Sequence, residues 1–113
     1  MEYYRNLYVG EQIARRCQKI KEKLNKGGTV WNTYLIVLPE SSHNQLEFFD
    51  SILLKQDWFK EKDYLVVGMA AGYGEALKVT ERIVDDVYKK TNSADIRDVL
   101  EKWHHMESGS KVE

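Results

Sequence analysis

The residues with the clearest potential for chemistry form one short cluster, Glu40-Ser41-Ser42-His43. The cluster combines a hydroxyl, an imidazole and a carboxylate, which are the groups that nucleophilic catalysis uses. Adjacent Ser and His side chains rarely have the geometry for proton transfer, and Ser42 followed by Gln45 is also the pattern of a helix capping box. We therefore expect no catalytic residue here, and we keep Glu40, Ser42 and His43 as candidate ligand-binding residues.

A glycine-rich junction is the second candidate binding site. Gly72-Tyr73-Gly74 resembles the start of a dinucleotide-binding loop, but Leu77 stands where the third glycine is needed and no strand follows the helix. The negative charge of Glu75 suits the start of a helix but repels a phosphate. We expect these glycines to serve tight strand-to-helix packing and predict no cofactor, while Gly72, Tyr73 and Gly74 stay candidate ligand-binding residues.

The two candidate loops would form one site only if the strands that precede them were parallel. Residues 39–63 are long enough for a helical crossover, which would make those strands parallel. Loops 40–43 and 72–74 would then lie together at the carboxyl edge of the sheet, where open α/β folds bind ligands. Antiparallel strands would place the loops at opposite ends and remove the shared pocket.

Histidine and cysteine give no further site. His104 and His105 are neighbours, so on a helix they point about 100° apart and cannot face one metal ion together. Glu101 and His105 have a suitable spacing, but two ligands are too few, and we predict no metal site. Cys17 is the single cysteine and lies in an apolar stripe, where we expect a small buried side chain rather than a reactive thiol.

Basic residues concentrate on one side of the first predicted helix. Residues 1–29 hold seven basic and three acidic residues, a net charge of +4, whereas the remainder holds ten and fifteen, a net charge of −5. Such asymmetry can mark an anionic partner. No aromatic residue interrupts the helix to stack on bases, however, and the whole chain carries −1. We expect a solvated basic face beside the acidic remainder and weak nucleic-acid binding or none; the candidate residues are Arg15, Arg16, Lys19, Lys23 and Lys26.

Hydrophobic periodicity places these residues on secondary-structure elements. Apolar runs without alternation predict strands at Tyr34–Leu38 and Tyr64–Met69. Spacings of three and four residues predict helices from Val9 to Gly27-Gly28, Leu46 to about Gln56, Tyr73 to Lys90, and around Ile96 to Trp103. The second helix competes with a short strand at 51–54. The long third helix is expected to bury one wide apolar face: Ala76, Leu77, Thr80, Ile83, Val84, Val87 and Tyr88.

These elements predict a small two-layer α/β or α+β domain in the order α-β-α-β-α-α, with helices packed on a short sheet. The domain is expected to span 1–107, followed by a disordered tail at 108–113. With 42% hydrophobic and 31% charged residues, the chain is not of the disordered class. One cysteine, no signal-peptide pattern and no long apolar segment predict a soluble cytoplasmic protein without a membrane partner.

Two strands are too narrow to cover the apolar faces of the predicted helices. The chain therefore either pairs with a second copy, most simply as a two-fold dimer, or gains a third strand from residues 3–9 or 51–55. The function we favour is a non-catalytic interaction or assembly module, whose partner is a second copy or another protein. The alternatives are a nucleic-acid-binding accessory protein that uses the first helix, and small-molecule binding or enzymatic activity at loops 40–43 and 72–74.

Overall fold

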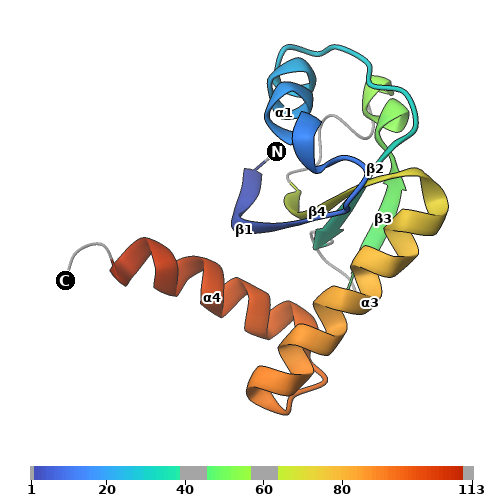
Figure 1. Cartoon of the computed structure of the whole chain (residues 1–113). Coiled ribbons are helices and arrows are strands. Elements are labelled where there is room, and N and C mark those ends of the chain that lie inside the picture. Colours follow the sequence, from blue (N-terminus) through green and yellow to red (C-terminus); the bar gives the residue numbers. More distant parts are fainter. Residues whose placement is uncertain (1, 39–45, 57–63, 111–113) are drawn as a thin grey trace.

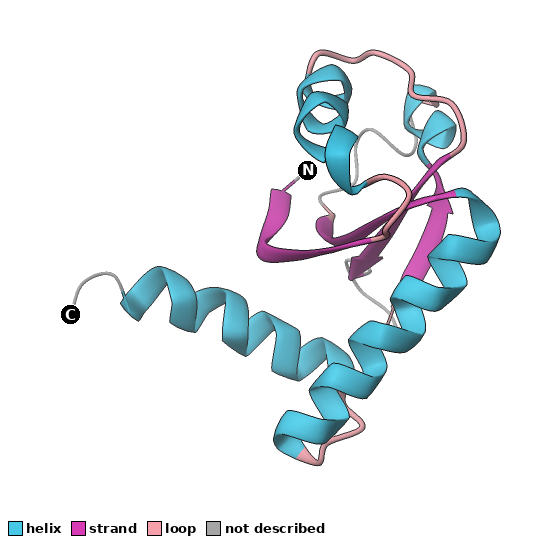
Figure 2. Ribbon diagram, in the orientation of Figure 1, coloured by secondary structure: helices cyan, strands magenta, loops and turns pink. Residues whose placement is uncertain are grey.

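A computed structural model describes residues 2–38, 46–56 and 64–110 of the chain. The fold class is confirmed, because helices pack on a short sheet in a small α+β arrangement (Figures 1 and 2). The described elements, in chain order, are β1 (Glu2–Val9), the 3-10 helix η1 (Ala14–Arg16), α1 (Cys17–Asn25), β2 (Thr33–Leu38), β3 (Glu47–Asp50), the 3-10 helix η2 (Ser51–Lys55), β4 (Leu65–Ala71), α3 (Gly72–Thr91) and α4 (Ile96–Ser110). Helix α4 thus continues into the segment predicted as a tail, and 111–113 lie outside the described residues.

The described strands form one mixed sheet in the order β1-β4-β2-β3. β1 is parallel to β4, whereas β2 is antiparallel to both β4 and β3. At one end of the β2–β4 pair, Leu38 lies opposite Leu65, and at the other end Thr33 lies opposite Ala71. Because β2 and β4 are the central strands and are covered on both faces, their sequences are apolar without alternation.

Strand β1 supplies the third strand that the sequence left open between residues 3–9 and 51–55. It lies at an edge of the sheet and pairs with β4 at both of its ends, where Tyr3 is opposite Val66 and Tyr8 is opposite Gly68. Five positions along β1 therefore correspond to two along β4, and the strand bends between its two paired ends (Figure 1).

The helix predicted at Leu46–Gln56 is wrong, since this segment forms β3 and then η2. The backbone N–H of Ile52 donates to the Asp50 carboxylate at 3.0 Å, which caps η2 where the strand ends. Phe48 packs with the core beneath α3, and Phe49 packs on the opposite face of the sheet. The helix-like spacing of apolar residues thus came from the two faces of a strand followed by a tight turn.

The first helix also begins later than predicted. Val9 ends β1, residues 10–13 form a turn, and α1 itself begins at Cys17. The apolar stripe is nevertheless buried as expected, because Ile13, Ile20 and Leu24 pack together against the sheet.

Each face of the sheet has its own hydrophobic core. Figure 2 shows the helices that lie on the two sides of the sheet. Helices α3 and α4 cover a cluster of Tyr4, Ile36, Leu38, Val67, Ala70, Ala76, Val79, Ile83, Val87, Ile96, Val99 and Leu100. Helix α1 covers the opposite cluster of Ile13, Ile20, Leu24, Leu35, Val37, Tyr64, Val66 and Met69. The sheet is wide enough to cover these helices within one chain. The two-stranded sheet from which we predicted a dimer is therefore replaced by one of four described strands.

The wide apolar face predicted for α3 is divided in two. Ala76, Val79, Ile83 and Val87 are buried against the sheet, whereas Leu77, Val84 and Tyr88 are 41%, 41% and 52% exposed. The prediction that the second group belongs to the core is therefore wrong. A helix packed on one sheet buries a stripe of limited width, and these residues lie beside that stripe.

Two valines of α3 test this division with the same substitution. Val87→Ala should lower the free energy of unfolding by about 1–4 kcal/mol, because it removes buried methyl groups and leaves a cavity. Val84→Ala, on the exposed side, should change it by at most about 0.5 kcal/mol. Denaturant unfolding curves measure both values, and equal costs would contradict the assigned orientation of α3.

Candidate functional site

The shared site predicted from the two loops required the strands before them to be parallel, and they are not. β2 and β4 are antiparallel, so the end of β2 that leads to loop 40–43 lies at the opposite edge of the sheet from Gly72. Glu40, Ser42 and His43 themselves lie outside the described residues. The glycine junction must therefore be judged together with the element that does lie beside it.

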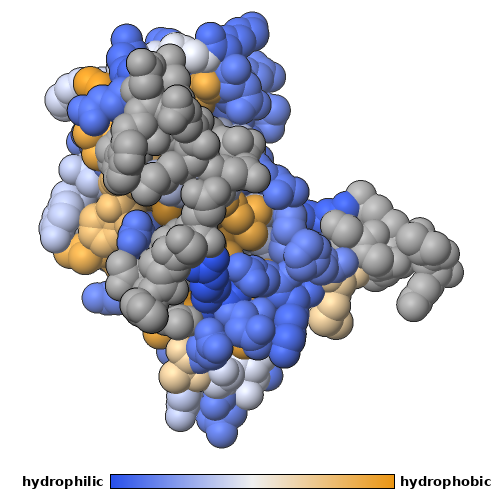
Figure 3. Space-filling model, turned by 180° about the vertical axis from the view of Figure 1, so that it is seen from behind, coloured by the Kyte–Doolittle hydropathy of each residue, from blue (hydrophilic) through white to orange (hydrophobic). Residues whose placement is uncertain are grey.

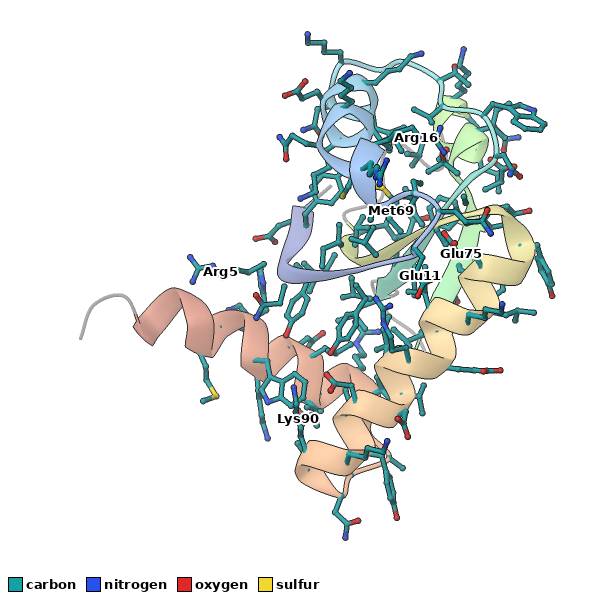
Figure 4. The ribbon with its side chains drawn as sticks, viewed as in Figure 1. Arg5, Glu11, Arg16, Met69, Glu75 and Lys90 are labelled. Carbon is teal, nitrogen blue, oxygen red and sulfur yellow. The ribbon has the colours of Figure 1, made fainter. Side chains whose placement is uncertain are left out.

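That element is the turn after β1. Because β1 and β4 are parallel, their carboxyl ends lie at one edge of the sheet, and the backbone N–H of Gly10 donates to the carbonyl of Met69 at 2.9 Å. From the first turn of α3, the Glu75 carboxylate accepts hydrogen bonds from the backbone N–H groups of Ala71 at 2.8 Å and Gln12 at 3.0 Å. The Glu75 side chain thus joins the turn after β1 to the start of α3. Figure 4 labels Glu75 near Glu11, the residue before Gln12 in that turn.

Two glycines are required by this junction. A Cβ atom at Gly10 would overlap the Glu75 carboxyl group. Gly72 has a φ of 84°, which side chains disfavour, and its N–H donates to the Asn32 carbonyl at 2.9 Å. Gly74 has open space around it. These contacts support the packing interpretation of Gly72, and they give Gly74 no packing role.

A cleft of about 440 Å³ opens beside the junction. Two of its charged side chains bond within the protein: Glu75 accepts the two backbone bonds, and Arg82 donates to the Val9 carbonyl at 3.0 Å while its guanidinium lies 5.8 Å from the Tyr8 ring. The lining residues contain no serine, cysteine or histidine, so they offer no nucleophile with its base. They are Glu11, Gln12, Gly74, Glu75, Lys78, Val79 and Arg82.

A polar network ties β1 to both long helices. The Tyr8 hydroxyl donates to the Asp86 carboxylate, which also pairs with Lys90 at 3.2 Å, and the Lys90 ammonium lies 5.6 Å from the Trp103 ring. Burial, followed by this hydrogen bond, raises the pKa of Tyr8, and the same hydrogen bond is the main cause of the lowered pKa of Asp86. The network borders a groove of about 660 Å³ between β1, α3 and α4, where Figure 4 labels Lys90.

The large exposed apolar residues of α3 lie on one side of the helix, which we call the outer face of α3: Tyr73, Leu77, Val84 and Tyr88. Tyr73, a candidate ligand-binding residue in the sequence, is 59% exposed at the start of this face. Its ring lies 5.4 Å from Phe48 and 6.2 Å from Tyr34, which extends the apolar surface toward the sheet. Tyr73 therefore belongs to a surface and not to the cleft.

The basic candidates occupy the opposite side of the sheet. Arg15 and Arg16 lie in η1 and the three lysines lie in or directly after α1, and all five side chains are exposed. Within the described part of the chain, none of them forms an ion pair with an acidic residue.

The histidine and cysteine candidates have structural contacts. His104 lies 3.2 Å from the Glu2 carboxylate, and Glu101 pairs with Arg97 at 3.2 Å. Cys17 is half-buried and packs against the core beneath α1. Among the residues with described positions, no cluster of three or more His, Cys, Asp or Glu side chains could hold a metal ion.

Comparisons with protein-family models, with curated proteins and with solved structures found no match to this chain. Within the described residues, no helix is long and apolar enough to cross a membrane. The candidate sites therefore rest on their own geometry.

The sequence pattern did not point to Tyr8 or Asp86, because β1 was not recognised as a strand beside α3. A signal was present in the alternation of residues 3–9. Tyr4 and Tyr8 face the core beneath α3, whereas Tyr3, Leu7 and Val9 face the core beneath α1.

The junction predicts an energetic coupling between Gly10 and Glu75. Gly10→Ala should lower the free energy of unfolding by roughly 1–3 kcal/mol, because its methyl group displaces the carboxylate from two backbone donors. In a Glu75→Ala background the same change should cost less, since the overlapping group is gone. Gly74→Ala, where a Cβ meets open space, is the control. Equal costs of Gly10→Ala in both backgrounds would show that the two residues are independent.

The Tyr8–Asp86 hydrogen bond predicts a pH dependence in acid. Since the pKa of Asp86 is lowered from 3.8 on folding, its carboxylate contributes stability above that pH and loses the contribution as the pH falls below it. Asp86→Asn should therefore reduce the loss of stability in acid, measured by urea unfolding at a series of pH values. Asp85→Asn, in the exposed pair with Lys89, is the matched control. This variant should still lose more stability in acid than Asp86→Asn does.

Proposed function

We propose that this chain is a non-catalytic assembly module that forms a two-fold dimer through the outer face of α3. The observation that carries the proposal is the row of four large apolar side chains, each 41–59% exposed, along the length of the helix. Apolar side chains gathered on one side of a helix are typical of protein contacts, whereas isolated exposed apolar residues are not. The helix that presents it is anchored by a buried core on its other side.

The row is suited to a second copy of itself because its spacing is symmetric. From Tyr73 the residues follow at intervals of four, seven and four positions, and the intervals are the same in either direction. In an antiparallel pair of α3 helices, Tyr73 would lie opposite Tyr88 of the other chain, and Leu77 opposite Val84. A two-fold interface needs such self-complementarity, because the same patch serves both chains.

A groove beside Tyr88 offers a place for the opposing aromatic ring. It has a volume of about 450 Å³, and Val84, Tyr88, Ala94 and Ile96 contribute apolar side chains to it. In the antiparallel arrangement, Tyr73 of the second chain would approach this groove. A ring that enters a preformed apolar groove buries more area than two rings in contact on a flat surface.

Charged residues beside the row also fit this arrangement. Lys78 and Asp85 lie on the same side of the row, so each would approach the opposite charge on the second chain. Glu81 lies near the centre of the row, where it would approach its own copy. This like-charge contact would weaken the dimer, so its removal should strengthen association.

The described edges of the sheet are less suited to assembly than α3. β1 bends between its paired ends, and its Val9 carbonyl already accepts a bond from Arg82. β3 has four residues. Bent and short edge strands are the usual protection against pairing with another strand, so a helix-mediated contact is the arrangement that this fold favours.

Sedimentation from about 1 to about 100 µM tests the proposal. We expect a species of twice 13.3 kDa whose fraction rises with concentration. Leu77→Glu with Tyr88→Ser should weaken association at least about tenfold without loss of folding stability, and Glu81→Gln should strengthen it. Ile52→Glu, at an apolar residue that is 47% exposed on η2, is the matched control. A single 13.3 kDa species across the range would contradict the proposal.

A further inference from the structure

The end of the molecule formed by η1, α1 and the loop after α1 carries a second surface that the assembly does not use. It lies at the end away from α4, and its hydrophilic side chains colour the top of the molecule blue when it is seen from behind (Figures 1 and 3). We call it the α1–Trp31 surface and define it by six exposed residues: Arg15, Arg16, Lys19, Lys23, Lys26 and Trp31. Glu22 of α1 is also exposed.

Its five cations form no ion pair within the described part of the chain. The ion pairs of the described residues join α3 or α4 residues to their own helix four positions away, or join His104 to Glu2. These pairs engage Glu2, Asp85, Asp86, Asp98 and Glu101 at other parts of the molecule. Five exposed cations outnumber the one exposed acid of α1, Glu22, and this excess of positive charge attracts an anionic partner at long range.

Trp31 supplies the aromatic group that the helix itself lacks. Its side chain is 83% exposed, the highest value among the large apolar side chains of the described residues. The turn that carries it is fixed, because Asn32 has a positive φ of 55° and its carbonyl accepts the Gly72 N–H at 2.9 Å. The Thr33 hydroxyl also donates to the Trp31 carbonyl at 3.3 Å. An indole on a fixed turn offers a flat face for stacking at a small cost in conformational entropy.

We infer that the α1–Trp31 surface binds single-stranded nucleic acid, with the cations along the phosphates and Trp31 stacked on a base. Grooves that bind single strands combine these two features, a track of positive charge and an exposed aromatic ring. A nine-residue helix extends about 13 Å, and with the following loop this is a length suited to about four nucleotides. The inference does not depend on the α3 dimer.

A membrane surface fits the same residues less well. An interfacial helix inserts its apolar side into the lipid, but Ile20 and Leu24 of α1 are buried against the sheet. The large apolar side chains exposed at this end, among the described residues, are Trp31 and Ile52. Two separate side chains give little apolar area for insertion, whereas one indole is enough to stack on a base.

Fluorescence anisotropy with labelled oligonucleotides of about 12 thymidines or uridines tests the inference on the full chain. If four phosphates are neutralised, affinity should fall about 50-fold between about 50 and about 200 mM salt. Arg16→Glu with Lys19→Glu should lower affinity at least about tenfold at the lower salt. Trp31→Ala should lower it by about 5- to 100-fold, and Trp31→Phe by less. Lys102→Glu, on exposed α4, is the charge control and should change it by less than about twofold.

Three results would overturn the inference. They are absence of binding to either oligonucleotide at low salt, affinity that does not change in Trp31→Ala, and equal affinity for the duplex of the same length. Binding to anionic phospholipid vesicles without binding to oligonucleotides would assign the surface to membranes instead. A difference between the thymidine and uridine strands would identify DNA or RNA as the preferred ligand. Circular dichroism of each variant confirms that it is folded.

Discussion

The parallel pairing of β1 with β4 is the contact on which the rest of this structure depends. It makes β4 a central strand, and it brings the turn after β1 to the start of α3, where Glu75 bonds to backbone groups of both. The same pairing places Tyr4 and Tyr8 over the helices, so that Asp86 and Lys90 of α3 connect to β1. Without β1, the core beneath α1 would also lose Tyr3, Leu7 and Val9 from one side.

The sequence was sufficient for the elements whose signal is local. The central strands and α3 show it clearly. A continuous run of Leu, Ile and Val indicates a buried strand, and apolar residues spaced by three and four positions indicate an amphipathic helix. It was insufficient for β1, whose partner β4 is distant along the chain, and for β3, which has four residues. The exposed side of α3 was misassigned for a related reason: periodicity shows where apolar residues gather, but not how much of that surface a sheet covers. The lack of ion pairs on the basic face, among the described residues, and the exposure of Trp31 depend on tertiary structure, which no local pattern contains.

The two proposed surfaces lie on different layers, and this separation has a functional meaning. The outer face of α3 belongs to the helix layer on one side of the sheet, and α1 covers the other side. A dimer formed through α3 would therefore leave both α1–Trp31 surfaces open. Two such surfaces on one particle would give an anionic strand two linked attachment points, and linked sites bind more tightly than either alone when the strand can reach both.

The long-range pairing of β1 also sets the order in which the chain can fold. β2 and β3 are neighbours in sequence and can pair early, but Tyr3 must wait for Val66, 63 positions later in the chain. Closing so long a loop lowers the entropy of the chain before the stabilising contacts of β1 can form. Folding is slower for this reason. During synthesis, the tyrosines of β1 emerge before β4 and cannot pair with it until β4 has been made. For that interval the nascent chain presents an aromatic strand without its partner, a feature that chaperones recognise and that favours misassembly at high concentration.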